Sequence, residues 1–372
     1  MNLKADCRHF RNDKPCRFGC GCEGCRHYEP MGKRILIVKL DAIGDVARTT
    51  PLLEPLRRTY SPCHITWLVA PMAEDLLKGN PRVDVLLSYR AESLEALRIQ
   101  KFDLVLSLDK TPRATAVATW ANAPEKFGFG LSEYGTIFPF NPESEYALAL
   151  GLDDDLKFRR NKKTYQEIVF ACCKLPYRGE EYALDLPAEA RAYAAEKLKQ
   201  WATAEDETVI GLNLGGGSAF ANKMWEPPKC IEFIRALNDA LDCKVLLLGA
   251  ERERERIERI LAQAPDNVLS AGTDNTIRQF QALLGCCDAV VTGDSLGMHL
   301  AIAEKRPVVA LFGPTCPQEI ELYGRGERIV SPVDCAPCYR SCCKKSPTCM
   351  ETIEPSAVVE AVRRLLTQDV SP

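Results

Sequence analysis

Continuous apolar runs constrain the fold of this chain more than any other feature. Residues 34–40 (RILIVKL), 208–214 (TVIGLNL) and 307–313 (PVVALFG) are examples. Strands with this pattern are buried on both faces, as in parallel sheets that helices cover. Amphipathic stretches such as 227–241 (PPKCIEFIRALNDAL) follow such runs along the chain. The alternation predicts an α/β fold built on doubly wound parallel sheets.

The predicted strands and helices form two series, one over residues 34–109 and one over residues 208–313. Two series predict two Rossmann-like lobes with a cleft between them. With 372 residues, 46% of them hydrophobic, the chain is long enough for two cores. We expect four parts: a Cys-rich segment (1–30), an N-terminal domain (31–185), a C-terminal domain (186–354) and a final helix (355–372) that packs back on the N-terminal domain.

Charge and hydropathy exclude several classes of protein. A net charge of −3 creates no general basic field, so we expect no nucleic-acid partner. No apolar run approaches the roughly 18 residues of a membrane span. The opening MNLKADCRHFRNDKPCRFGC is charged and lacks the apolar stretch of a secretory signal. The sequence therefore predicts an intracellular, cytoplasmic protein, and leaves peripheral contact with a membrane open.

Residues 213–225 (NLGGGSAFANKMW) form the first of three loops that point to chemistry. In open parallel sheets, ligands bind outside the carboxyl ends of the strands. Consecutive glycines let backbone N–H groups approach an anion, and Ser218 and Lys223 can bind phosphate oxygens. The spacing is not that of a P-loop, and glycines alone fit a surface loop equally well. The nearby lysine favours a phosphate ligand.

Residues 291–301 (VTGDSLGMHLA) form the second loop, where a predicted strand ends and a helix opens at Gly297. The amides at such a helix start carry partial positive charge and suit a diphosphate. Taken singly, Asp294 and Ser295 fit helix N-caps better, and His299 fits a packed helix residue. The combination is more specific than its parts.

Residues 41–50 (DAIGDVARTT) form the third loop, after the strand 34–40. Asp45 there either satisfies helix N–H groups, which is the usual role, or acts as a general base facing the phosphate loops of the other lobe. We expect a helix over residues 50–60, with Thr50 as its N-cap and Pro51 at its first position.

Together these loops resemble glycosyltransferase family 9, the heptosyltransferases of lipopolysaccharide core assembly. The matching stretches are residues 35–57, 211–237 and 288–319, and the resemblance covers roughly residues 33–368. It implies a GT-B fold: two Rossmann-like domains facing a cleft, with an ADP-heptose donor in the C-terminal domain and the acceptor sugar in the N-terminal domain. It also implies an inverting transfer that needs no metal.

The resemblance assigns roles to individual residues. Asp45 takes the role of base, and Lys39 reaches toward the leaving group. Glu251 or Glu253 matches an acidic residue that contacts the donor ribose, and we select Glu251. The residues expected to hold the donor are Gly216, Gly217, Ser218, Lys223, Glu251, Asp294, Ser295, Gly297 and His299.

Two departures from the family pattern concern the acceptor side. Asp41 adds a second carboxylate near the proposed base, which leaves open which of the two Asp residues works. The stretch 109–120, in the expected acceptor region, has no clear family match that would identify the acceptor. Arg48, Lys110 and Arg113 are candidates for binding an anionic sugar or its phosphate, although any one of them fits a solvated surface charge better.

Ten of the 18 cysteines lie in two clusters. Cys7, Cys16, Cys22 and Cys25 supply enough thiolates for a closed, structural Zn²⁺ site, with Cys20 as a spare and His9 and His27 as further candidates. The alternative is unpaired thiols on a disordered tail. The second cluster comprises Cys335, Cys338, Cys342, Cys343 and Cys349, and it fits a second metal, an iron–sulfur cluster or disulfides equally well.

The favoured function is thus an inverting glycosyltransferase that moves heptose or a similar sugar from an ADP-sugar to a lipopolysaccharide-core or other cell-surface glycan, which can be lipid-linked. The clustered cysteines motivate a rival: a non-catalytic metal- or redox-responsive binding protein on the same scaffold. A dehydrogenase is a weaker alternative, because the Gly-rich loops lack the dinucleotide fingerprint.

Overall fold

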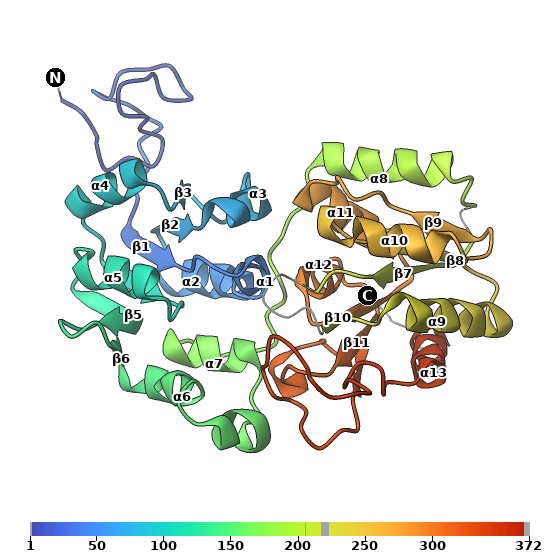
Figure 1. Cartoon of the computed structure of the whole chain (residues 1–372). Coiled ribbons are helices and arrows are strands. Elements are labelled where there is room, and N and C mark those ends of the chain that lie inside the picture. The colour runs from blue at the N-terminus through green and yellow to red at the C-terminus, as the bar shows by residue number, and fades with distance from the viewer. Residues whose placement is uncertain (1, 205, 217–222, 368–372) are drawn as a thin grey trace. The chain divides into compact units, whose positions relative to one another are not determined.

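The computed structural model of the chain describes residues 2–204, 206–216 and 223–367. The chain divides into two compact units (Figure 1). The first unit holds the residues up to 42, together with 51–148 and 169–177. The second holds 43–50, 149–168 and the residues from 178 onward.

The first unit is built on a six-stranded sheet in the order β3-β2-β1-β4-β5-β6. Neighbouring strands are parallel except for the antiparallel pair β5 and β6. The strands are β1 (Lys33–Val38), β2 (Cys63–Val69), β3 (Val85–Ser88), β4 (Leu104–Ser107), β5 (Glu125–Leu131) and β6 (Ile137–Pro139). The helices that the chain forms among and after these strands are α2 (Leu53–Thr59), α3 (Glu74–Leu77), α4 (Ala91–Ile99), α5 (Pro112–Trp120), α6 (Glu145–Ala149) and α7 (Tyr165–Cys172).

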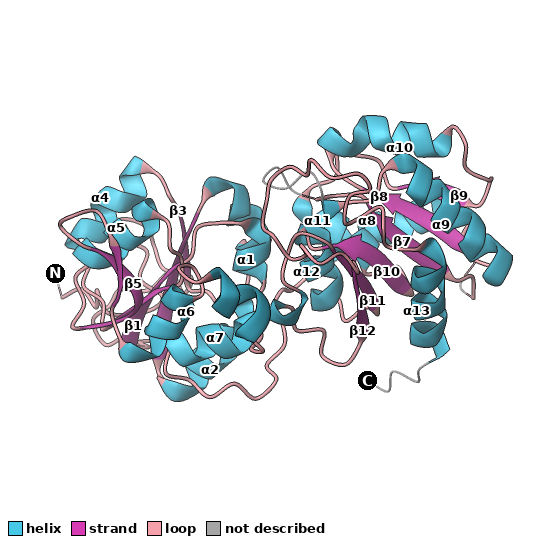
Figure 2. Cartoon of the chain, turned by 60° about the horizontal axis from the view of Figure 1, so that its bottom comes forward, coloured by secondary structure: helices cyan, strands magenta, loops and turns pink. Residues whose placement is uncertain are grey.

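The central strand β1 explains why this sheet forms. Its residues Ile35, Leu36, Ile37 and Val38 are all fully buried, so both faces of the strand are covered. Helices lie on either side of the sheet (Figure 2). Burial of about 25 cal/mol for each Å² of apolar surface makes such a strand the main local source of stability. The prediction from the apolar run is confirmed.

The second unit repeats the architecture with six parallel strands in the order β12-β11-β10-β7-β8-β9. This is the Rossmann strand order. The strands are β7 (Val209–Asn213), β8 (Lys244–Leu248), β9 (Val268–Ser270), β10 (Ala289–Gly293), β11 (Val308–Phe312) and β12 (Gly326–Val330). The helices are α1 (Ile43–Ala47), α8 (Ala188–Gln200), α9 (Pro227–Ala240), α10 (Arg254–Leu261), α11 (Ile277–Leu284), α12 (Leu296–Ala303) and α13 (Pro355–Thr367).

Helix ends in the second unit follow from local chemistry. Prolines occupy the first positions of α9, where a missing N–H costs nothing. Thr276 and Gln279 form a capping box at the start of α11: the Thr276 hydroxyl accepts from the Gln279 N–H, and the Gln279 side chain accepts from the Thr276 N–H.

The final helix and the domain boundaries differ from expectation. Helix α13 packs on α9 and on strands β10 to β12 of the second unit, so the prediction that it packs back on the N-terminal domain is wrong. Its buried face, which includes Val358, Val362 and Leu365, completes the core over that sheet. The short segments 43–50 and 149–168 also belong to the second unit, although the predicted boundary fell at residue 185.

Thr50 does not cap a helix. A 3₁₀ turn runs from Thr50 to Leu52, and α2 starts only at Leu53. The Thr50 hydroxyl instead donates to the Ala47 carbonyl at 2.7 Å and accepts from the Ala183 N–H at 3.0 Å. A contact 133 residues away in sequence replaces the local cap that the sequence predicted.

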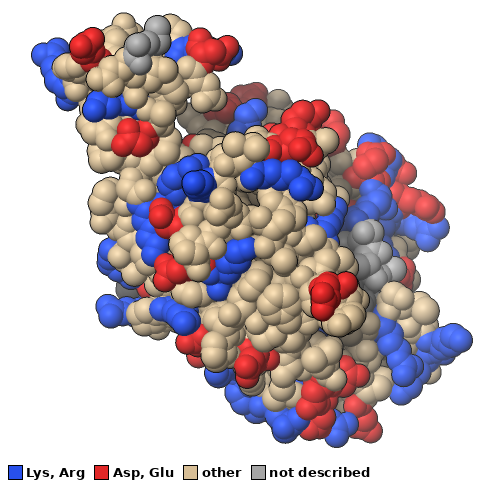
Figure 3. Space-filling view, turned by 90° about the vertical axis from the view of Figure 1, so that its left-hand side faces the viewer, with Lys and Arg blue, Asp and Glu red and all other residues tan. Residues whose placement is uncertain are grey.

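Two surface features bear on function. Of the helices in the described ranges, none combines the length and apolar character that crossing a bilayer requires. On the face drawn in Figure 3, Lys and Arg side chains alternate with Asp and Glu side chains, and neither sign dominates.

Candidate active site

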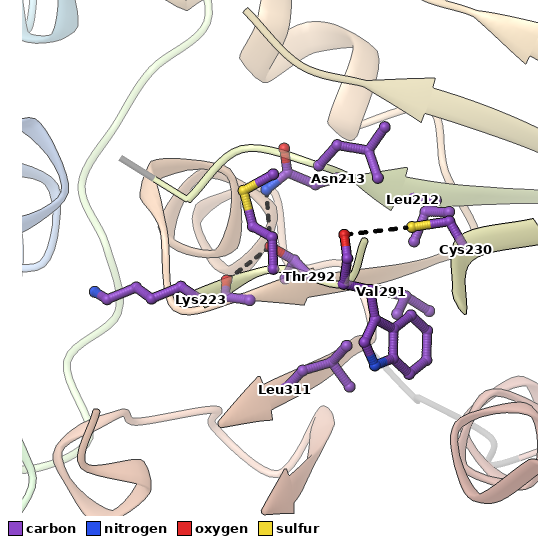
Figure 4. A pocket seen from close by; sticks show the side chains of 11 residues that line it. Leu212, Asn213, Lys223, Cys230, Val291, Thr292 and Leu311 are labelled. Carbon is purple, nitrogen blue, oxygen red and sulfur yellow. Dashed lines mark hydrogen bonds between the residues drawn. The ribbon is translucent and has the colours of Figure 1, made fainter. Parts of the chain in front are cut away.

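The strand order of the second unit reverses between β7 and β10, and the candidate site lies at the carboxyl ends of these two strands. Such a switch point is where open α/β sheets bind ligands. A pocket here is lined by Asn213, Lys223, Thr292 and Gly293, with Trp225, Cys230 and Leu311 among its apolar walls. Figure 4 shows the Lys223 ammonium extending away from the strands.

Asn213, the last residue of β7, holds the two strand ends together. Its side-chain amide donates to the Thr292 hydroxyl at 2.8 Å and to the Ser295 hydroxyl at 2.9 Å. Its side-chain carbonyl accepts from the Gly215 N–H at 3.2 Å (Figure 4 shows the link between Asn213 and Thr292). Three hydrogen bonds of one buried side-chain amide thus orient Gly215, the end of β10 and the start of α12.

Glycines permit this close packing. A Cβ at Gly297 would collide with the Asn213 side chain, and a Cβ at Gly293 would collide with the Lys223 backbone carbonyl. Gly297 therefore lets the first turn of α12 approach the end of β7. Gly293 lets the segment that carries Lys223 cross the end of β10.

Lys223 and Asp294 form an ion pair in the site. The Lys223 ammonium lies 3.1 Å from an Asp294 carboxylate oxygen and donates to the Asp294 backbone carbonyl at 3.2 Å. Burial favours the neutral acid, but the charge of Lys223, supported by that of Arg48, outweighs it and lowers the pKa of Asp294. The predicted phosphate-binding lysine thus lies beside the predicted donor-binding carboxylate.

Helix α1 lies alongside α12 in the same unit. A Cβ at Gly44 would come within 2.7 Å of the His299 ring, so Gly44 is the residue that allows the approach. Asp45 lies in the first turn of α1. The charges of Asp45, Arg48, Lys223 and Asp294 all act on His299. The structure therefore brings the predicted base and the predicted donor residues into one cluster.

Arg48 forms an ion pair with Asp45. Its guanidinium is 2.8 Å from the Asp45 carboxylate and sits over the Tyr165 ring, 3.8 Å from the ring centre. Burial opposes the charge, but Asp45 and Tyr165 more than offset it and raise the pKa of Arg48. Tyr165 is itself held by a 2.8 Å hydrogen bond to the Thr49 hydroxyl. Arg48, predicted to bind the acceptor, is paired with the predicted base in the structure.

His299 is buried and neutral. Its Nδ1 lies 2.9 Å from the Tyr182 hydroxyl. Burial, reinforced by the charge of Arg48, lowers the pKa of His299 to about 4. At neutral pH the imidazole is therefore an uncharged hydrogen-bonding group among four charged side chains.

The remaining predicted residues of the N-terminal lobe lie in the first unit. Lys39 is buried at the end of β1, where it donates to the Asp41 carbonyl and lies 3.9 Å from the Asp109 carboxylate. Arg113 forms an ion pair with Asp41. Lys110 donates to the Ala147 carbonyl at 2.8 Å. The second carboxylate that raised doubt about the base is thus paired with one of the predicted acceptor residues.

The two acidic residues after β8, Glu251 and Glu253, differ in burial and in role. Glu253 is buried and its carboxylate accepts from the Ala250 N–H at 3.0 Å, so it caps the following turn. Glu251 is exposed, accepts from the Thr273 hydroxyl at 3.0 Å and pairs with Arg254. Glu251 therefore remains the candidate for a ligand. Gly216 is buried, and Gly217 and Ser218 lie outside the described residues.

Four residues of these clusters were not singled out from the sequence: Asn213, Asp109, Tyr165 and Tyr182. Asp109 is buried and accepts from the N–H groups of Leu40, Asp41 and Thr111, which shapes the loop after β1. A polar residue at the carboxyl end of a buried strand was a usable signal for Asn213 and Asp109. Nothing near Tyr165 or Tyr182 in the sequence indicates their partners.

The C-terminal cysteines gather near the end of β11. The Cys338 N–H donates to the Pro314 carbonyl at 3.0 Å, which docks the loop there. Cys349 is buried, and its burial, with the nearby thiols of Cys338, Cys343 and Cys335, raises its pKa. In the described ranges, no three His, Cys, Asp or Glu side chains are arranged so that they could hold a metal ion.

Comparison with known proteins agrees with this architecture. The lipooligosaccharide heptosyltransferase 2 of Haemophilus influenzae is 27% identical over 314 residues, which cover 76% of this chain and 84% of that protein. The enzyme of the same name from Campylobacter jejuni, 28% identical over 166 residues, is matched over only 52% of its length. The solved structure of the Escherichia coli ADP-heptose LPS heptosyltransferase II superposes with a TM-score of 0.64, 22% identity, and coverage of 91% of this chain and all of that one.

Two Rossmann-like units of this kind define the GT-B class of glycosyltransferases. The model of glycosyltransferase family 9 (heptosyltransferase) matches residues 90–348, and the chain belongs to this family. It is a glycosyltransferase, as the motifs predicted.

Proposed function

We propose that the protein transfers heptose from ADP-heptose to a lipopolysaccharide-core acceptor, with inversion at the anomeric carbon. The family and the names of the relatives support the class of reaction. One observation supports the assignment of roles to individual residues. Helix α1, which contains Asp45, packs on α12 in the unit that also holds Lys223 and Asp294. A carboxylate base and a phosphate-binding cluster are thereby parts of one unit.

Asp45 is the proposed base. In an inverting transfer the acceptor hydroxyl attacks the anomeric carbon and loses its proton, while the bond to the diphosphate breaks. A carboxylate within hydrogen-bond reach of that hydroxyl accepts the proton. The ion pair with Arg48 fixes the orientation of the Asp45 carboxylate, which the stacking of Arg48 on Tyr165 reinforces.

Lys223 and the start of α12 are proposed to stabilise the departing ADP. The N–H groups of the first turn of α12 provide partial positive charge, and the Lys223 ammonium adds a full one. Before donor binds, Asp294 partly neutralises Lys223. The diphosphate of the donor carries more negative charge than the Asp294 carboxylate and competes with it for Lys223. Glu251 is proposed to bind the ribose of the donor.

Release of ADP from ADP-heptose in the presence of a heptose-deficient core acceptor tests the proposal, with UDP- and GDP-sugars as comparison donors. Asp45→Asn should lower the transfer rate by about 10²- to 10⁴-fold, the usual contribution of a general base, and leave ADP binding in place. Asp41→Asn is the matched control, since this carboxylate shares the loop but is paired with Arg113. A fully active Asp45→Asn protein, or an inactive Asp41→Asn protein alone, contradicts the assignment.

The rival function, a non-catalytic metal- or redox-responsive protein, is separated by calorimetry with ADP. The glycosyltransferase proposal expects ADP binding that weakens at least tenfold in Lys223→Met. Metal-dependent partner binding without affinity for ADP would favour the rival.

A further inference from the structure

We propose that the N-terminal segment, residues 2–31, is a small metal-binding module that holds one Zn²⁺ through the thiolates of Cys7, Cys16, Cys22 and Cys25. Nothing in the transferase chemistry uses this segment. It belongs to the first unit and stands outside the strands of that unit's sheet.

The segment encloses a cavity whose walls are mostly metal-ligand side chains. All five of its cysteines and both of its histidines contribute to the lining, which also includes Phe10, Phe18 and Tyr28. The Cys20 and Cys25 sulfurs are 3.5 Å apart. Thiols separated by up to 18 positions in sequence therefore face the same small space.

Four backbone turns start at the four proposed ligands. The carbonyls of Cys7, Cys16, Cys22 and Cys25 accept hydrogen bonds from the N–H groups of Phe10, Gly19, Cys25 and Tyr28, at 2.9 to 3.4 Å. Each turn reverses the chain directly after a cysteine, and residues that follow the cysteines, such as Phe10, Phe18 and Tyr28, line the same cavity. Cys20 starts no such turn in these bonds and is exposed, which is why it is excluded from the ligand set.

The segment has almost no core of its own. Among residues 2–30, only the Cys7 side chain is buried. A piece of this size with one buried side chain cannot offset its conformational entropy by apolar burial, so it needs a cross-link or a metal. Backbone turns without a hydrophobic core are typical of small domains that a bound metal ion stabilises.

Both histidines already have partners within the segment, which favours thiolates as ligands. His27 is stacked on Phe18 with ring centres 4.0 Å apart, and the Nε2 of His9 lies 3.0 Å from the Glu29 carboxylate. Four thiolates with a CxxC pair suit tetrahedral Zn²⁺. The residues that line the cavity include no Asp or Glu, so among its described residues cysteine is the main source of anionic ligands.

Arg8 fastens the segment to the rest of the first unit, and one backbone bond joins the two ends of the segment. The Arg8 guanidinium donates to Glu29, to the Cys63 carbonyl at the start of β2 and to Asp84. The Met31 N–H donates to the Asp6 carbonyl at 2.8 Å. The segment thus forms a loop whose two ends are joined and which is attached to the first unit through Arg8. Since no ready-made metal group exists in the described residues, binding must draw the four thiols inward, which couples metal binding to ordering of the segment.

The test is elemental analysis of the full-length protein, purified under reducing conditions, for the wild type and for single Cys→Ser variants. Because the C-terminal cysteines can hold metal independently, the result is read as the difference between variants. Cys16→Ser and Cys25→Ser should each lose one equivalent of zinc per chain. Cys20→Ser, the matched control inside the same cavity, should keep it.

Cobalt substitution provides a second readout, because four thiolates around Co²⁺ give intense charge-transfer absorption that Cys16→Ser should remove. Zinc contents equal to wild type in both ligand variants would overturn the proposal, as would disulfides among these cysteines in protein purified with a thiol-blocking reagent. Loss of zinc in Cys20→Ser with retention in Cys22→Ser would overturn the ligand set. These readouts do not involve ADP release, so their failure is distinct from failure of the proposed transferase function.

Discussion

At the residue scale, the candidate site is a set of compensated charges around one neutral imidazole. Asp45 is paired with Arg48, and Lys223 with Asp294. Such pairing stabilises charged groups that are partly removed from solvent, since an unpaired charge in such a place is costly. His299 cannot add a further positive charge at neutral pH, because Arg48 and the loss of solvent disfavour its protonation.

His299 makes the stability of the fold sensitive to acid. Its pKa is about 4 in the folded chain and 6.5 when exposed, so between these values the unfolded chain binds a proton that the folded chain does not. Stability from this group is complete above pH 6.5 and is lost as the pH falls toward 4. Between pH 7 and pH 5 the wild type should lose about 2 kcal/mol more than His299→Gln. Denaturant unfolding at the two pH values measures this, and equal losses in both proteins would contradict it.

At the element scale, the approach of α12 to β7 decides the geometry of the site. The Asn213 amide joins the end of β7 to the end of β10 and to Ser295, the N-cap residue of α12. Gly297 is the small residue that allows this approach. Helix starts bind anions only when their amides are held at the right place, so the Asn213 contacts have a functional consequence.

Gly297→Ala should destabilise the second unit by about 1–3 kcal/mol, the usual cost of overpacking, and should weaken ADP binding. The added methyl group meets the Asn213 side chain, whose three hydrogen bonds prevent it from moving aside. Gly21→Ala is the control, because a Cβ there meets nothing within 4 Å. Thermal unfolding and ADP titration of both variants measure these effects. Equal thermal midpoints and equal ADP affinities in the two variants would show that the close contact of residue 297 with Asn213 is unimportant.

At the scale of the whole molecule, the chain passes between its two units several times. Residues 43–50 leave the first unit to lie on the second, and residues 149–168 do the same. They bring Asp45, Arg48 and Tyr165 to the site, and the Gln318 side chain donates to the Lys157 carbonyl at 3.0 Å. The second unit is therefore incomplete without two segments that precede it in sequence.

A fragment of residues 178–372 should fold, because it contains the whole sheet β7–β12 and its helices, but less stably than the full chain. It lacks α1, which covers α12, and it exposes apolar surface there. Its thermal midpoint should lie several degrees below that of the same unit in the full-length protein. Identical midpoints would mean that the two inserted segments contribute no stability.

Local patterns in the sequence were sufficient for the strands and the family. The apolar runs at residues 34–40, 208–214 and 307–313 became β1, β7 and β11, because a strand buried on both faces must be apolar throughout. Strands β5, β6, β9 and β12 were missed, and of these β6, β9 and β12 contain partly exposed residues that lack the pattern.

The sequence by itself determined the two Rossmann-like sheets and the loops at their carboxyl ends, because apolar continuity and strand-to-helix turns are local properties. Only the tertiary structure decided that α1 joins the second unit, that Arg48 lies over the Tyr165 ring, and that Tyr182 meets His299. The last two contacts with tyrosine join positions 117 residues apart. No local pattern encodes such partners, since they are selected by the packing of complete elements.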